Sequence, residues 1–161
     1  KRVLFRSNEF AYFDLWEDPT IFLSRRYLGY DSISQGAFRS FLSERYGGNV
    51  TALNSRWRTS FGSFGEVVMP KFMSPNRDQP GYHDVLQWRK TSIGDFIAEG
   101  AKAVRAVDPN HLFTYSMVGG IFNSSDANNT CEDARAIVAS CKAAGAPLDF
   151  WSINKIGRAH V

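Results

Sequence analysis

Short apolar segments alternate with amphipathic helical segments along this chain, and this alternation constrains the fold more than any single motif does. Nothing repeats at a period of roughly 20–50 residues, so a solenoid is not expected. The expected strands are residues 1–7, 112–117 and 148–153, and the expected helices are residues 35–46, 49–57, 84–107 and 130–144. Strands that are joined by helices form parallel βαβ units with right-handed crossovers. The pattern therefore predicts an α/β protein with a parallel sheet.

The segment 84–107 gives the strongest helical signal. Its apolar positions fall on one helical face and are Leu86, Ile93, Ile97 and Val104. Asp108-Pro109 is expected to end this helix, because the residue before a proline disfavours the α region. Two segments lack a clear period and are expected to be irregular: the aromatic-rich residues 10–34 and the Gly-, Pro-, Ser- and Asn-rich residues 58–83.

Local signals mark the ends of the other helices. Asn49 is expected to cap the helix that runs to Trp57. Gly47-Gly48 is expected to end the helix before it. Thr130, with Asp133 three residues later, resembles a capping box and is expected to open the helix 130–144.

Composition argues against several classes of protein. The 43% hydrophobic and 14% aromatic residues suit a folded core, and a net charge of +3 without a Lys/Arg cluster does not favour nucleic-acid binding. No apolar run reaches the roughly 18 residues of a membrane-spanning helix, so no membrane association is expected. Cys131 and Cys141, on one expected helix, would lie roughly 15 Å apart, too far for a disulfide. His83 and His111 complete no zinc spacing, so neither a metal nor a cofactor is expected.

The two ends of the sequence suggest that the chain is an internal part of a longer protein. Lys1 is not an initiator residue, and the chain enters an expected strand at once. Residues 156–161, Ile-Gly-Arg-Ala-His-Val, match the translation of a common sequencing adapter. We therefore expect residues 1–155 to be the folded part and residues 156–161 to be an artefact.

Two blocks carry the most specific pattern in the chain. They are residues 38–47, Phe-Arg-Ser-Phe-Leu-Ser-Glu-Arg-Tyr-Gly, and residues 53–61, Leu-Asn-Ser-Arg-Trp-Arg-Thr-Ser-Phe. With Asn8-Glu9 ahead of them, they resemble the segment that follows the acid/base glutamate in glycoside hydrolase family 42. That family consists of microbial β-galactosidases among the clan-A (β/α)₈ retaining glycosidases. Phe41 stands where the family often has Trp, and Arg58 stands where it often has Gly.

The resemblance implies a partial TIM (β/α)₈ barrel that comprises about strands 4 to 6 with their helices. Asn8 and Glu9 would then follow the fourth strand, with Glu9 as general acid/base and Asn8 bound to the sugar 2-hydroxyl. The nucleophile, a second glutamate after the seventh strand, would lie outside this chain. Trp16 is a candidate to stack on a sugar ring, and Asn154, just beyond the last expected strand, is a candidate to face the active site.

One departure from the family concerns metal binding. Family-42 enzymes often carry zinc-binding cysteines soon after the Asn-Glu pair, and residues 10–37 contain no cysteine. A clan-A glycosidase that acts on β-mannosides or β-glucans therefore stays open, as does a non-catalytic carbohydrate-binding barrel. An unrelated doubly wound domain is less favoured, because no G-x-G-x-x-G follows an expected strand. A carbohydrate is the expected partner, and the oligomeric state and compartment stay open.

Overall fold

The structure of this chain is a computed structural model that describes residues 12–17, 30–70, 79–118 and 133–154. In residues 12–17, 117–118 and 153–154 the description is confined to the backbone. The chain divides into two compact units: Ser24–Arg89 is one, and Lys1–Leu23 with Lys90–Val161 is the other.

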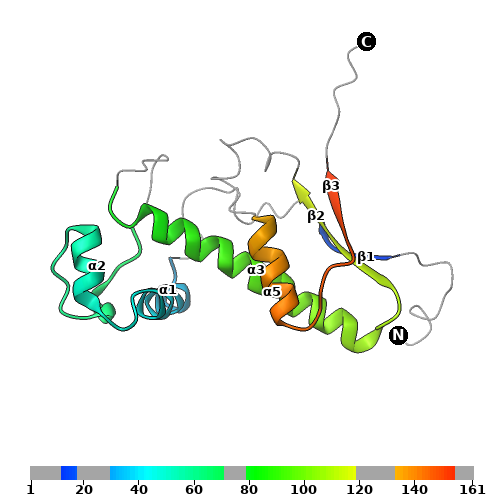
Figure 1. The fold of residues 1–161 in the computed structure, drawn as a ribbon, viewed down its shortest axis with the longest axis horizontal. Coiled ribbons are helices and arrows are strands. Elements are labelled where there is room, and N and C mark those ends of the chain that lie inside the picture. The colour runs from blue at the N-terminus through cyan, green and yellow to red at the C-terminus, as the bar shows by residue number, and fades with distance from the viewer. Residues whose placement is uncertain (1–11, 18–29, 71–78, 119–132, 155–161) are drawn as a thin grey trace, which may run out of the picture. The chain divides into compact units, whose positions relative to one another are not determined.

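The second unit contains a three-stranded parallel sheet, as the sequence predicts. Its strands are β1 (Tyr12–Glu17), β2 (Leu112–Val118) and β3 (Phe150–Asn154), and the order is β1-β2-β3 (Figure 1). Helix α5 (Ala134–Ala143) lies between β2 and β3 in the chain, which makes a βαβ unit. The expected α/β class is therefore confirmed.

The central strand β2 is buried on both faces from Phe113 to Ser116. Phe113, Thr114 and Tyr115 are fully buried and Ser116 is 5% exposed, so none of these four positions alternates toward water, whereas Leu112 at the start of the strand is exposed. A strand in a parallel sheet that is covered on both faces has this character. The Thr114 hydroxyl satisfies its hydrogen-bonding need by donating to the Phe150 carbonyl at 2.9 Å.

Helix α3 (Tyr82–Val107) begins two residues before the expected start and ends at the expected residue, next to Asp108-Pro109. In its Lys90–Val107 part, Ile93, Ile97 and Ala101 are buried. Phe96 and Val107, which lie off this buried stripe, are exposed.

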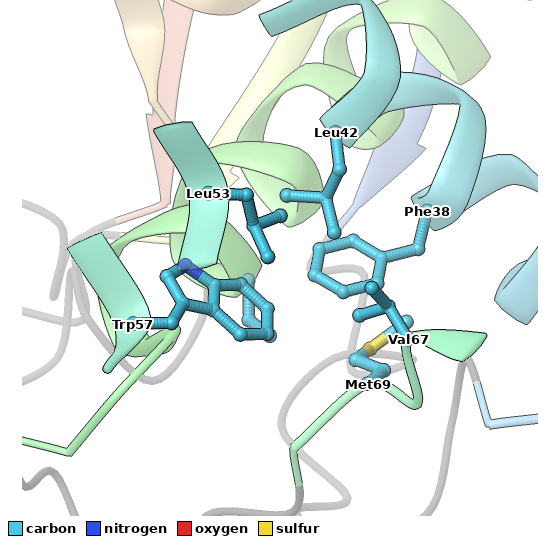
Figure 2. Packing of buried hydrophobic residues seen from close by; sticks show 7 residues of the cluster. Phe38, Leu42, Leu53, Trp57, Val67 and Met69 are labelled. Atoms are coloured by element: carbon cyan, nitrogen blue, oxygen red, sulfur yellow. The ribbon is translucent and has the colours of Figure 1, made fainter. Parts of the chain in front are cut away.

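The unit Ser24–Arg89 contains α1 (Ser32–Arg45), α2 (Val50–Trp57), the short 3₁₀ helix η2 (Phe64–Glu66) and the first turns of α3. Its core is a cluster in which the labelled side chains converge (Figure 2). The members are Phe38, Leu42, Leu53, Trp57, Val67, Met69 and Val85. The cluster is built from both of the sequence blocks that resemble family 42, so those blocks have a shared structural role.

The caps of these helices follow local rules. Asn49 caps α2, because its side chain accepts from the amides of Thr51 at 3.0 Å and Ala52 at 3.2 Å, as predicted. Gly47 and Gly48 follow α1 with φ of +58° and +72°, a conformation that glycine adopts without strain.

Two expectations about the elements are wrong. The strand next to β2 is residues 12–17, inside the segment expected to be irregular, because Tyr, Phe and Trp favour strands and here find a partner in β2. The expected strand 1–7 lies outside the described residues. Helix α5 is capped by Asp133, which accepts from two amides of the first turn, so the helix begins after the predicted position. Thr130 and Cys131 lie outside the described residues.

Candidate active site

The carboxyl ends of the three strands meet at one edge of the sheet. β1 ends at Glu17, which is in register with Ser116, and the last residue of β2, Val118, is in register with Asn154 of β3. In (β/α)₈ enzymes the active site is built at this edge, from residues at strand ends and in the loops that follow. The carboxyl edge is therefore the candidate location for catalysis.

Two of the four predicted site residues lie at this edge by their backbone. Trp16 is the penultimate residue of β1, and Asn154 is the last residue of β3. Trp16 was expected in a loop above the site, and the strand places it earlier, within the sheet. The side chains of both residues are outside the description.

Asn8 and Glu9 lie outside the described residues. The strand that pairs with β2 starts at Tyr12, so it follows the Asn8-Glu9 pair in the chain, whereas the prediction placed a strand before it. The residue that closes β1 at the carboxyl edge is Glu17, which was not among the predicted site residues. The sheet thus adds a second glutamate that a test of the catalytic role has to include.

The opposite, amino edge of β2 and β3 is held by charged side chains. Asp149 accepts from the Phe113 amide at 2.7 Å and is paired with Arg105, while the Asp149 amide donates to the Phe113 carbonyl at 2.9 Å. Arg105 also donates to the His111 carbonyl at 2.7 Å. These contacts join the end of α3 to the starts of both strands, and polar residues at this edge of a barrel serve stability.

The turn between α3 and β2 is organised by Asp108, which is 5% exposed. Its carboxylate accepts from the amides of Asn110 at 3.0 Å and His111 at 3.1 Å, and lies 2.6 Å from Nδ1 of His111. Burial alone would raise the pKa of Asp108, but these hydrogen bonds outweigh it and lower the pKa. The prediction that Asp108-Pro109 ends the helix is confirmed, and the side chain explains why the turn is fixed.

A second polar cluster lies in the unit Ser24–Arg89, around Asp84. This residue is 1% exposed, and its Oδ2 accepts from the Tyr46 hydroxyl and from Nε1 of Trp57, both at 2.7 Å. Its Oδ1 lies 2.8 Å from Nε of Arg45 in an ion pair, although the angle there is not that of a hydrogen bond. No short sequence pattern signals this cluster, because its members come from three helices.

A pocket of about 640 Å³ lies beside this cluster, between the end of α2 and the start of α3. Its lining residues include Arg56, Trp57, Arg58, Tyr82 and His83. None of these residues was predicted to have a site role. The one sequence signal was Arg58, which departs from the glycine expected there from the resemblance to family 42.

Within the described ranges, no group of three or more His, Cys, Asp or Glu side chains could hold a metal ion. Cys141 is buried with a free thiol, and burial raises the pKa of that thiol, which disfavours the reactive thiolate. None of the helices in the described part of the chain has the length and apolarity to cross a membrane.

Comparison with known proteins identifies the family. The Glyco_hydro_42 family model, described as beta-galactosidase, matches residues 25–138. The chain belongs to glycoside hydrolase family 42. The match begins after Asn8, Glu9 and Trp16 and ends before Asn154, so it says nothing of these four residues.

One solved structure shares the fold of this family-42 chain. The beta-galactosidase from the psychrophilic Marinomonas ef1 matches with a TM-score of 0.56 and 19% sequence identity. The match covers 78% of this chain and 18% of that chain, so the family-42 chain described here spans under a fifth of its solved neighbour. No curated protein matches it.

Proposed function

We propose that the full-length protein containing this chain is a retaining glycosidase that hydrolyses β-galactosides. Residues 1–155 would be the central part of its (β/α)₈ catalytic domain, about strands 4 to 6, with Asn8-Glu9 after the fourth strand and with β2 and β3 as the fifth and sixth. The observation that carries the proposal is the family-42 match over residues 25–138. The parallel sheet, and the fold shared with a beta-galactosidase, support it.

Retaining hydrolysis needs two carboxyl groups about 5–5.5 Å apart. One attacks the anomeric carbon, and the other protonates the leaving oxygen and then removes a proton from water. We assign the acid/base role to Glu9 and place Asn8 on the sugar 2-hydroxyl, on the strength of the family resemblance. Trp16 and Asn154, from β1 and β3, would line the sugar site, and the nucleophile would be a glutamate outside this chain.

The acid/base assignment is tested by Glu9→Gln in the full-length protein. We expect kcat on a β-galactoside with a poor leaving group to fall by about 10²–10⁴-fold, the usual contribution of general acid–base catalysis. An aryl β-galactoside with a good leaving group needs no protonation, so its glycosylation step should be less affected. Added azide should restore turnover and yield a galactosyl azide, since the small anion attacks the glycosyl-enzyme without a general base.

Two further variants serve as the control and as the test of an alternative acid/base residue. Glu44→Gln, at an exposed position on α1, should leave kcat unchanged. Glu17→Gln tests the glutamate that closes β1, and an azide-rescued loss there, with none in Glu9→Gln, would move the acid/base role to Glu17. Absence of β-galactoside hydrolysis by the wild type would overturn the proposed activity. Turnover of β-mannosides or β-glucans would then favour the alternative specificity.

A further inference from the structure

The pocket between α2 and α3 has a positively charged rim and a rigid wall. Arg56 and Arg58 flank Trp57 in the chain and line the pocket with it. Trp57 is 3% exposed and points toward Phe38 in the hydrophobic cluster, with ring centroids 6.3 Å apart (Figure 2). Because Trp57 is buried between two exposed arginines, its packing fixes the backbone positions of Arg56 and Arg58.

Arg58 is held in a backbone conformation that costs energy. It follows α2 with φ 57° and ψ 48°, and among the described residues no other non-glycine residue has a positive φ. Side chains other than glycine rarely adopt this left-handed region. Glycine would adopt this conformation without strain, so the presence of arginine is a reason to look for a role of its side chain.

Among the described residues, no ion pair compensates the charge of Arg56 and Arg58. The side chains of Arg56 and Arg58 make no hydrogen bond or ion pair with any described residue. Among the described lining residues the one carboxylate is Asp84, which is already engaged by Arg45, Tyr46 and Trp57. Two guanidinium groups therefore face the pocket with their donors open, and His83 adds a third nitrogen donor group.

We propose that this pocket binds the anionic group of an acidic saccharide, a carboxylate or a sulfate ester, with Arg56 and Arg58 as its ligands. The planar fork of a guanidinium matches both groups and can donate two parallel hydrogen bonds. The volume of about 640 Å³ accommodates a sugar ring. The saccharide part of the inference rests on the proposed function, whereas the anionic part rests on the pocket itself.

Calorimetric titration of the full-length protein tests the inference. Galacturonate and a galactose sulfate ester should bind with an affinity that falls as salt is added, because screening weakens charge contacts at an open site. Galactose should bind at least about tenfold more weakly, which corresponds to the loss of one charge-assisted contact. Inorganic sulfate alone should also bind more weakly than the sulfated sugar.

Arg58→Gly separates recognition from stability. It removes the guanidinium and relieves the left-handed backbone, so binding of the acidic sugars should fall about tenfold while the midpoint of thermal unfolding rises by a few degrees. Arg58→Lys keeps the charge without the fork and should show a smaller loss of affinity. Arg135→Ala, an exposed arginine on α5, is the matched control and should change neither property.

The outcomes are distinct from those of the hydrolysis test. Equal binding of acidic sugars by wild type and Arg58→Gly would overturn the assignment of this pocket. Equal affinity for inorganic sulfate and the sulfated sugar would overturn the saccharide part. Acidic-sugar binding that depends on Arg58, in a protein without β-galactosidase activity, would support the pocket and refute the proposed reaction.

Discussion

Replacing Asp84 by alanine should strongly destabilise the unit Ser24–Arg89. The carboxylate is the common acceptor for the Tyr46 hydroxyl and the Trp57 indole, and Trp57 is itself in the hydrophobic cluster. Without Asp84, the indole N–H of Trp57 would stay buried and would have no hydrogen-bond acceptor. An unsatisfied buried donor loses its hydration without compensation.

The size of the effect follows from which contacts are buried. A hydrogen bond to a charged group contributes about 1.5–3 kcal/mol, so the two bonds to Oδ2 together give about 3–6 kcal/mol. The ion pair adds little, because the Arg45 side chain is 40% exposed and water screens it. Against a typical total stability of about 5–15 kcal/mol, this loss is large.

Chemical denaturation of the full-length protein, with hydrogen exchange of the α2 amides, measures the loss where it occurs. Asp95→Ala is the matched control: Asp95 is exposed on the same helix and accepts one hydrogen bond, from Ser140 at 2.8 Å. Its free energy of unfolding should change by less than about 1 kcal/mol. A change of that small size in Asp84→Ala would refute the reasoning.

The same variant has a signature at high pH. Burial, together with the hydrogen bond to Asp84 and its charge, raises the pKa of Tyr46 to about 12 from the ordinary 10.0. Since the folded pKa exceeds the unfolded one, this stabilising contribution is complete below pH 10 and is lost as the pH rises toward 12. Asp84→Ala should lower the pKa of Tyr46, seen in the tyrosinate absorbance, but not fully, because burial acts as well.

Two further substitutions test the packing and capping of α5. In Gly94→Ala the new Cβ would lie 2.8 Å from Ser140 Oγ and 3.0 Å from the Ala136 carbonyl oxygen, so thermal unfolding should show a loss of about 1–2 kcal/mol despite the better helix propensity of alanine. A higher midpoint would mean that α5 yields freely. For Asp133, burial alone would raise the pKa. The Lys90 ammonium at 3.1 Å and the amides of the first helical turn outweigh burial, so the pKa is lowered overall. Its contribution is therefore complete above pH 3.8 and is lost as the pH falls through the lowered value, so acid titration of Asp133→Ser, which retains a capping oxygen, should show a weaker acid dependence than the wild type. An unchanged acid dependence would contradict this role of Asp133.

Local patterns predicted the features that local physics controls. The period of apolar residues gave α3, and Asn49 and the glycines after α1 gave helix ends that the structure confirms. These signals work because a cap or a helical face depends on residues at most a few positions apart. The order of strands and helices was enough to predict a parallel sheet.

Contacts between distant segments were the part that no pattern could supply. Asp84 meets Trp57 and Tyr46 across 27 and 38 positions of the chain, so their hydrogen bonds are visible only in three dimensions. β1 was missed because its aromatic residues fit a loop or a strand equally well, and the pairing with β2 decides between them. The left-handed conformation of Arg58 was likewise hidden, apart from the replaced family glycine.

The continuous burial of β2 from Phe113 to Ser116 limits how this part of the strand can change over evolutionary time. In a strand with one solvent-exposed face, every second position can accept a polar substitution with little effect on stability. Between Phe113 and Ser116 there is no such position, so accepted exchanges must conserve volume and satisfy every polar atom. The outward positions of α5, such as the exposed Val138, have no such restriction and can drift. Among divergent homologues, β2 is therefore the segment whose side-chain volumes should be preserved longest.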